Sequence, residues 1–260
     1  MSPDLQATEL SCTALDIAVQ ECVLVAQLNL QLQPGTLTAV LGRNGTGKSL
    51  TLHTLAGLRP AKTGQVQLGA RELQHYPRRE LAQHLSFVPQ DIDEPFPVTV
   101  LECALSGRHP HIDFWQWETA QDYAIARTAL AAVDLQHFEQ RNVETLSGGE
   151  RRRLAIATAL AQQPQVFILD EPTNHLDPQH QLQVLKLLRD KADAGAAVIM
   201  SLHDPNLAAR FADQALLLFG DGRWLHGNSS DIIGADTLSQ LYKTTMQEFT
   251  ALQGRYFVSA

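Results

Sequence analysis

The sequence lacks the features that mark disulfide scaffolds, general nucleic-acid binders and membrane spans. Its three cysteines, Cys12, Cys22 and Cys103, are too few and too scattered for a disulfide framework or a zinc site. The formal net charge is −8, and phosphate backbones require clustered cations, so general binding to nucleic acid is disfavoured. No apolar run approaches the length of a bilayer span, and no basic stretch followed by an apolar segment marks a secretory signal. We therefore expect free thiols in a cytoplasmic chain.

Long linkers, internal repeats and low-complexity tracts are also absent from the 260 residues. Hydrophobic residues make up 44% and charged residues 18%, which is ordinary for a globular protein and excludes a disordered chain. We expect one large domain, or one domain with an inserted lobe.

Short apolar runs flank a segment whose apolar residues recur with helical spacing. This order of strand, helix and strand predicts an α/β fold with a parallel sheet. Two of the runs are wholly apolar, as in strands buried on both faces of a sheet. From about residue 98 to 163 the strand signal nearly vanishes, which predicts an inserted helical lobe. The last stretch, 221–260, predicts a hairpin at Asp221-Gly222 followed by short helices. Strands are expected at 36–41, 65–68, 85–88, 166–169 and 197–200, and helices at 48–58 and 179–194.

The first chemical motif is a glycine-rich loop between an expected strand and an expected helix. It matches G-x-x-x-x-G-K-[ST], in which glycines let backbone N–H groups converge on phosphate oxygens while the next helix points its N-terminus at the same anion. We expect Lys48 to reach the β- and γ-phosphates and Ser49 to ligate Mg²⁺. The flanking elements make a chance glycine-rich turn the weaker interpretation. The expected nucleotide contacts are Gly42, Asn44, Gly45, Gly47, Lys48, Ser49 and Leu50.

Two further motifs carry carboxylates and glycines. Asp170 and Glu171 follow the apolar run 166–169, so Asp170 can hold Mg²⁺ through water and Glu171 can act as general base. An acidic pair that merely caps a strand is the alternative, but the phosphate loop makes it improbable. In 146–150 (LSGGE), Ser147 can cap a helix, and the two glycines after it allow close approach to an anion.

The phosphate loop, LSGGE and VFILDE, in this order and spacing, resemble the ATP-binding-cassette ATPases over nearly the whole chain. The resemblance implies that Gln90 is the Q-loop glutamine that touches Mg²⁺ and water, 174–177 (NHLD) the D-loop, and His203 the switch histidine at the γ-phosphate. It implies an α/β P-loop NTPase fold of the RecA-like type. Residues 1–97 and 164–260 would form the core, with an N-terminal antiparallel β part, and 98–163 a helical signature subdomain.

In that family two cassettes form a head-to-tail dimer with ATP between them. The phosphate loop of one chain faces the start of the signature helix of the other, so a homodimer or a second cassette is implied. Water would attack the γ-phosphate in line, with positioning and charge stabilisation as the main contributions. The implied cofactors are ATP and Mg²⁺. The implied catalytic residues are Glu171, His203, Gln90 and Lys48; Ser49, Gln90 and Asp170 would serve the metal; Ser147, Gly148, Gly149 and Asp177 would join the nucleotide contacts.

Some positions depart from the family pattern. No Phe, Tyr or Trp precedes Tyr76, so the usual aromatic stack on adenine is missing, and the aliphatic positions near 15–19 would hold the base by apolar packing. Leu50 stands where a threonine hydroxyl usually meets the α-phosphate, and Thr158 stands where many relatives have Arg. None of these departures removes a side chain that is needed at the γ-phosphate.

A single cassette without a membrane part resembles the ATPase subunits of bacterial importers. The segments 107–111 (GRHPH), 203–209 (HDPNLAA), 241–242 (LY) and 254–258 (GRYFV) resemble the branch that imports iron chelates, namely siderophores and haem, or cobalamin. The resemblance implies separate membrane permease subunits, a periplasmic substrate-binding protein, no nucleic-acid partner, and a peripheral place on the cytoplasmic face of the inner membrane. It does not separate the three cargoes.

Several alternatives stay open from the sequence. Residues 91–97 either line a groove for a coupling helix of the permease or form a mobile acidic loop. Trp115 and Trp117 either face that partner or pack in the core. His109 and His111 lack the spacing of a helical metal-ligand pair. The alternative function is a soluble cassette ATPase of translation or DNA repair, although such relatives usually have two cassettes or a long coiled coil. A small-molecule kinase would not explain LSGGE or His203.

Overall fold

A computed structural model describes residues 9–91, 97–113, 115–251 and 254–260. Its centre is a six-stranded sheet of β3 (Leu37–Leu41), β6 (Leu85–Val88), β7 (Val166–Leu169), β8 (Ala197–Ser201), β9 (Gln214–Leu218) and β10 (Trp224–Asn228). The strand order is β10-β9-β3-β8-β7-β6. All neighbours pair in parallel except β9 and β10, which form the antiparallel hairpin expected around Asp221-Gly222. The predicted α/β fold is confirmed.

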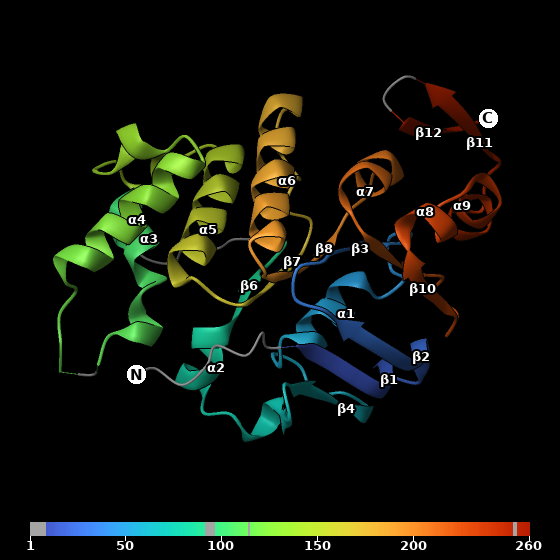
Figure 1. Cartoon of the computed structure of the whole chain (residues 1–260), viewed down its shortest axis with the longest axis horizontal. Helices are drawn as coiled ribbons and strands as arrows, with labels where there is room; N and C mark the ends of the chain where they lie inside the picture. The colour runs from blue at the N-terminus through green and yellow to red at the C-terminus, as the bar shows by residue number, and fades with distance from the viewer. Residues whose placement is uncertain (1–8, 92–96, 114, 252–253) are drawn as a thin grey trace.

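A second sheet is antiparallel and belongs mainly to the N-terminal part of the chain. It contains β1 (Leu10–Val19), β2 (Cys22–Leu32), β4 (Thr63–Leu68) and β5 (Arg71–Glu72), in the order β2-β1-β4-β5. Helix α1 (Lys48–Leu55) lies between the two sheets (Figure 1). Its Leu52 and Leu55 pack in one core with Leu15 of β1 and with Val40 and Ile168 of the central sheet.

The opposite face of the central sheet is covered by α6 (Pro178–Asp193) and α7 (Pro205–Phe211) (Figure 1). Along β3 the side chains alternate between the two faces, as a pleated strand requires. Ala39 and Leu41 join the core on the α6 side, while Val40 joins the core on the α1 side. Because both faces are covered, the central strands are mostly apolar, and β7 is apolar throughout, as its sequence predicts.

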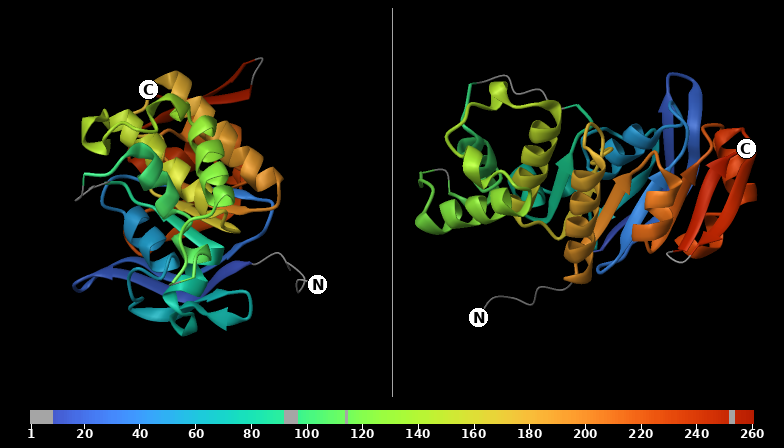
Figure 2. Two further views of the ribbon diagram at one scale, coloured as in Figure 1. Left: turned by 90° about the vertical axis from the view of Figure 1, so that its left-hand side faces the viewer. Right: turned by 90° about the horizontal axis from the view of Figure 1, so that it is seen from above.

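A helical lobe occupies one end of the molecule, and the C-terminal elements occupy the other (Figures 1 and 2). The lobe contains α3 (Val100–Ser106), α4 (Ala120–Ala132) and α5 (Gly148–Gln162). A Cβ on Gly107 would lie 2.3 Å from the carbonyl oxygen of Thr158, so glycine lets the end of α3 touch α5. The buried Arg108 donates to Asp122 at 3.0 Å and to the carbonyl of Ala161 at 2.7 Å. Gly107 and Arg108, the first two residues of the GRHPH segment, therefore hold the lobe together.

Short elements connect these layers. Between β5 and β6 lie η1 (Leu73–His75) and α2 (Arg78–His84), and the lobe includes the 3-10 turns η2 (His109–His111), η3 (Gln136–Phe138) and η4 (Val143–Thr145). No helix in the described ranges is both long and apolar enough to cross a membrane.

Two elements differ from the sequence expectation. Helix α1 ends at Leu55 rather than at residue 58, because Gly57 adopts a left-handed backbone (φ +68°) that ends the helix. After α8 (Ser229–Ile232) and α9 (Ala235–Tyr242), the chain forms an unexpected hairpin of β11 (Met246–Ala251) and β12 (Gly254–Ser259). Most of β11 is exposed, so it lacks the alternating apolar pattern that marks a strand.

Candidate functional site

The motifs converge at one edge of the central sheet because they follow neighbouring parallel strands. The loop 42–49 follows β3, His203 follows β8, Asp170 and Glu171 follow β7, and Gln90 follows β6. In space these strands lie side by side in the order β3-β8-β7-β6. Ligands of open α/β sheets bind outside the carboxyl ends of the strands. The topology therefore brings these four segments to the edge where a ligand is expected.

The glycine-rich loop is shaped by positions that only glycine fills easily. Gly47, the N-cap of α1, has φ +99°, and Gly45 has φ +80°. A Cβ on Gly42 would lie 2.6 Å from the carbonyl oxygen of Leu218 and 2.6 Å from Oγ1 of Thr46. The loop is therefore packed against the end of β9, and its free side can meet an anion at the start of α1.

Lys48 is buried and lies across the loop. Its Nζ donates to the carbonyl of Gly42 at 3.0 Å and to that of Arg43 at 3.3 Å. Burial lowers the pKa of Lys48, while the nearby Glu171 and Asp170 carboxylates act in the opposite direction. A phosphate oxygen would offer this ammonium a charged acceptor in place of two neutral carbonyls.

Asp170 is fully buried at the end of β7 and has one unused oxygen. Its Oδ1 accepts from the Ser201 hydroxyl at 2.6 Å. Its Oδ2 is buried and has no hydrogen-bond partner among the residues the structure covers. A buried carboxylate oxygen without a donor is costly unless a cation or a water meets it. This orphaned atom fits a Mg²⁺ site.

No cluster of three or more His, Cys, Asp or Glu side chains that could hold a metal occurs within the described parts of the chain. A cation at Asp170 would therefore depend on phosphate oxygens and water for most of its ligands. Mg²⁺ in nucleotide sites is bound in this way, by one or two carboxylates together with substrate phosphates.

Glu171 is held in a left-handed backbone conformation with φ +50°. Its N–H donates to the Ser201 hydroxyl at 2.8 Å. One carboxylate oxygen lies 2.6 Å from Nε2 of His203, and the other accepts from the side-chain amide of Asn174. The structure thus places the two expected catalytic side chains from β7 and β8 in direct contact.

The signature residues lie against the D-loop of the same chain. Ser147 caps α5, since its Oγ accepts from the N–H of Glu150, whose carboxylate accepts in turn from the N–H of Ser147. A Cβ on Gly149 would lie 3.0 Å from the carbonyl oxygen of His175, and Asp177 caps α6. The serine hydroxyl can still donate its hydrogen outward, and both Ser147 and Gly148 are exposed.

Two buried residues at this edge have no site role in the sequence-based prediction. Ser201 bonds to Asp170 and Glu171, and Arg152 of α5 donates to backbone carbonyls at the ends of β6 and β7. A signal for Arg152 was present: three consecutive arginines on one helix span about 200° of its circumference, so they cannot share one solvent face. Nothing in the sequence distinguishes Ser201 from other residues at a strand end.

The expected base-binding run is only partly available. Leu15 and Ile17 are buried in the core between the sheets, which leaves Val19, 45% exposed, as the aliphatic side chain of this run at the surface. Leu24 of β2 lies close to Gly47, where a glycine Cβ would approach it to 3.3 Å.

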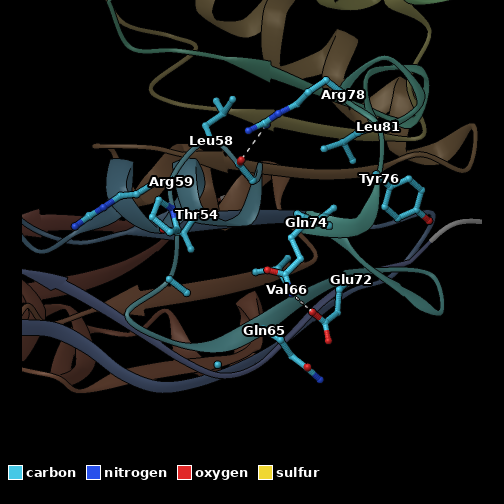
Figure 3. A pocket seen from close by; sticks show the side chains of 15 residues that line it. Thr54, Leu58, Arg59, Gln65, Val66, Glu72, Gln74, Tyr76, Arg78 and Leu81 are labelled. Atoms are coloured by element: carbon cyan, nitrogen blue, oxygen red, sulfur yellow. Dashed lines mark hydrogen bonds between the residues drawn. The ribbon is translucent and has the colours of Figure 1, made fainter.

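Two cavities lie away from the loop 42–49. One, of about 430 Å³, is at the C-terminal end of α1 (Figure 3). Two of its charged side chains are already hydrogen-bonded, because Arg78 donates to the carbonyl of Gly57 and Glu72 accepts from Gln74. The second, of about 890 Å³, lies between the end of β6 and the helical lobe. Its lining includes Asp91, Glu102, Glu118, Tyr123, Leu105 and Thr158.

The segment 91–97 contributes Asp91 to the lining of this second cavity. Its residues 92–96 lie outside the described part of the structure, so the choice between a coupling groove and a mobile loop stays open for them. Trp115 and Trp117 are 90% and 88% exposed, so the alternative that they pack in the core is wrong.

A phosphate loop, an acidic pair after a buried strand and a histidine in contact with that pair define a P-loop nucleoside triphosphatase. A model of the ABC transporter family matches residues 25–174. The chain belongs to the ATP-binding-cassette family of transporter ATPases, which bind and hydrolyse ATP.

Curated relatives are similar over most of their length. The chain is 42% identical over 223 residues to the hemin import ATP-binding protein HmuV of Pseudomonas fluorescens, covering 84% of this chain and 86% of that protein. It is 35% identical to the ferric enterobactin transport ATP-binding protein FepC of Escherichia coli, with 83% and 80% covered. Its fold matches a chain of an inward-facing ABC transporter assigned to the metal-chelate type, with a TM-score of 0.84, 32% identity, and 97% and 98% covered.

Proposed function

We propose that this chain is the ATP-hydrolysing subunit of a bacterial importer that takes up an iron chelate, such as haem or a siderophore, or cobalamin. The observation that carries the proposal is the similarity, over more than four fifths of the chain, to import ATPases named for hemin and for ferric enterobactin. The GRHPH and HDPNLAA segments support the same branch. The chain would act with separate membrane permease subunits and lie peripherally on the cytoplasmic face of the inner membrane.

In the proposed reaction, ATP binds with its phosphates on the loop 42–49. Lys48 gives up its hydrogen bonds to the loop carbonyls and binds the β- and γ-phosphate oxygens instead. Its ammonium then neutralises part of the phosphate charge. Glu171 accepts a proton from the attacking water, and His203 donates to the γ-phosphate. Because these two side chains now bond to each other, His203 must release Glu171 before both can act on substrate and water.

Mg²⁺ would be held by Asp170, with Ser49 and Gln90 as further ligands directly or through water. The support from this structure is the orphaned Oδ2 of Asp170. When bound, the cation neutralises charge on the phosphates and orients them for in-line attack. Ser201 keeps the Asp170 carboxylate turned so that Oδ2 stays free, since it occupies Oδ1.

A second copy of the chain would complete the site. Ser147, Gly148 and Gly149 contact their own helix and the D-loop, whereas the loop 42–49 packs against β9 and Leu24 of the same chain. The exposed Ser147 and Gly148 therefore remain available to the nucleotide of a head-to-tail partner, to which Gly149 and Asp177 would also contribute. A periplasmic substrate-binding protein would act only indirectly, through the permease.

The cavity between β6 and the lobe is proposed to receive a cytoplasmic helix of the permease. The cavity lies between the segment next to Gln90 and the helices of the lobe, so an occupant would contact both of these parts. Asp91, Glu102 and Glu118 give it an acidic lining, which suits a helix that carries a basic residue. The exposed Trp115 and Trp117 lie in the loop next to Glu118 and extend this surface with aromatic area of the kind that anchors interfaces.

The test is affinity capture from native membranes. Tagged Glu171→Gln protein, loaded with ATP and Mg²⁺, is purified in detergent, and its partners are identified by mass spectrometry and visible absorbance. We expect a polytopic permease subunit, and an intense Soret band if the cargo is haem. The matched control is Lys48→Ala, which should not trap the nucleotide-bound complex. Recovery of ribosomes or DNA-repair proteins without a membrane subunit would overturn the importer assignment and leave the ATPase.

A further inference from the structure

Arg152 is a buried cation that reaches the nucleotide site from the signature helix. Its side chain leaves α5 and is 2% exposed. Its guanidinium donates to the carbonyl oxygens of Pro89, of Gln90 at 2.9 Å, of Asp170 at 3.2 Å and of Glu171 at 2.9 Å. One side chain thus joins α5 to the ends of both β6 and β7.

These partners are unusual for a buried charge. All four hydrogen bonds go to neutral backbone carbonyls, while the carboxylates of Asp170, Glu171 and Asp91 act on the guanidinium only at longer range. Burying a cation without a directly bonded anion is costly. The planar guanidinium, with five N–H donors in a fixed geometry, is the side chain suited to hold several carbonyls at once.

The neighbouring arginines face elsewhere and provide internal comparisons. Arg153, which is also buried, donates to the carbonyl of Val133 at 2.7 Å inside the lobe. Arg151 donates to the carbonyl of Glu144 at 2.8 Å, just before the signature serine. Of the three, Arg152 alone has described hydrogen bonds to the nucleotide edge of the sheet.

We propose that Arg152 is a positioning residue for hydrolysis, which fixes the backbone of Gln90 and Glu171 to the signature helix. Ser147 and Gly148 begin that same helix, so when a nucleotide of the partner chain moves them, Arg152 carries the movement to the general base and the Q-loop. Engagement of the signature motif and alignment of Glu171 then become one event. The inference rests on the proposed function, since it assigns Glu171 and Gln90 their roles in ATP hydrolysis.

The test compares Arg152→Lys with Arg153→Lys in the assembled transporter. Lysine keeps the charge, but a single ammonium cannot bond four carbonyls in this arrangement. For Arg152→Lys we expect kcat to fall about 100-fold, the loss typical of a misplaced catalytic group, while KM and ATP affinity change by less than about threefold. For Arg153→Lys we expect kcat to stay within about threefold of wild type. Urea unfolding of each variant checks that it is folded in the assay.

A kcat of Arg152→Lys within about threefold of wild type would overturn the positioning role, and so would equal losses of kcat and ATP affinity in both variants. If Arg152→Lys does not fold, the positioning role is tested instead by the kcat of Arg152→Gln and by hydrogen exchange in the wild-type complex. With a non-hydrolysable ATP analogue, the amides of Gln90 and Glu171 should gain protection together with those at the start of α5, and independent changes would refute the linkage. A wild-type complex without ATPase activity would instead refute the proposed function.

Discussion

Nε2 of His203 lies 2.6 Å from a carboxylate oxygen of Glu171, while the amide of Asn174 occupies the other oxygen. The carboxylate proposed as general base is therefore held between two side chains. Once His203 turns away, the oxygen that it contacts can accept from the attacking water. The γ-phosphate is a second charged acceptor that can compete for the same imidazole, so ATP itself can free the base.

Replacement of Glu171 by glutamine should separate binding from turnover. The amide keeps the size of the side chain and can still contact His203, but it cannot accept a proton from water. We expect kcat to fall by a factor of about 10²–10⁴, with ATP affinity unchanged within about twofold. Single-turnover hydrolysis and equilibrium nucleotide binding measure the two quantities. Hydrolysis at the wild-type rate would exclude Glu171 as the base.

Asp122 should make the stability of the lobe depend on pH. The hydroxyl and N–H of Thr119, followed by Arg108, lower the pKa of Asp122 from 3.8 to about 2. A carboxylate with a lowered pKa in the fold stabilises it fully above pH 3.8 and loses this contribution as pH falls toward 2. We expect Asp122→Asn to lower the free energy of unfolding by about 1–2 kcal/mol at pH 7.

Urea unfolding at several pH values measures this difference, which should shrink once the pH falls below about 4. The control is Asp113→Asn, which removes an ion pair of exposed side chains with Arg79 and should cost less than about 0.5 kcal/mol. A cost for Asp122→Asn that does not change with pH would contradict the assigned charge state.

Gly107→Ala should loosen the contact between α3 and α5. The new Cβ would lie 2.3 Å from the Thr158 carbonyl, a backbone atom that cannot move alone, so we expect a loss of about 1–3 kcal/mol. Gly69→Ala is the control, since its Cβ meets no atom within 4 Å and only the left-handed backbone costs energy, about 1 kcal/mol. Urea midpoints measure both. A smaller loss at Gly107 than at Gly69 would contradict the packing argument.

Removal of both exposed tryptophans should weaken assembly without touching hydrolysis. For the double variant Trp115→Ala, Trp117→Ala we expect the permease recovered in affinity capture to fall about tenfold, as when an interface anchor is truncated. ATP affinity of the isolated chain should stay unchanged. Phe249→Ala is the matched control, because Phe249 is also exposed, at 52%, but lies on the C-terminal hairpin. Equal permease recovery with all the variants would place the interface elsewhere.

The sequence predicts the convergence of the motifs at one edge of the central sheet because each motif is local. Loop 42–49 and the pair Asp170-Glu171 are contiguous runs next to apolar strands, so strand order alone brings them together. The hairpin of β11 and β12 was missed because its stability comes from distant atoms: the side-chain amide of Asn206 bonds to both the N–H and the carbonyl of Phe257. No local pattern marks such a contact. The three consecutive arginines predict that one of them leaves the solvent face, but the hydrogen-bond partners of Arg152 could not be predicted, since they lie far away in the sequence.

The exposure of Trp115 and Trp117 also determines what the intrinsic tryptophan fluorescence of this protein can report. The chain has three tryptophans, and the third, Trp224, is half-buried, with its indole N–H bonded to the carbonyl of Ala26 at 2.9 Å. Two of the three indoles are thus open to a dissolved quencher and stand together on one loop of the lobe. Intrinsic emission, to which all three tryptophans contribute, therefore responds to coverage of that loop without any label.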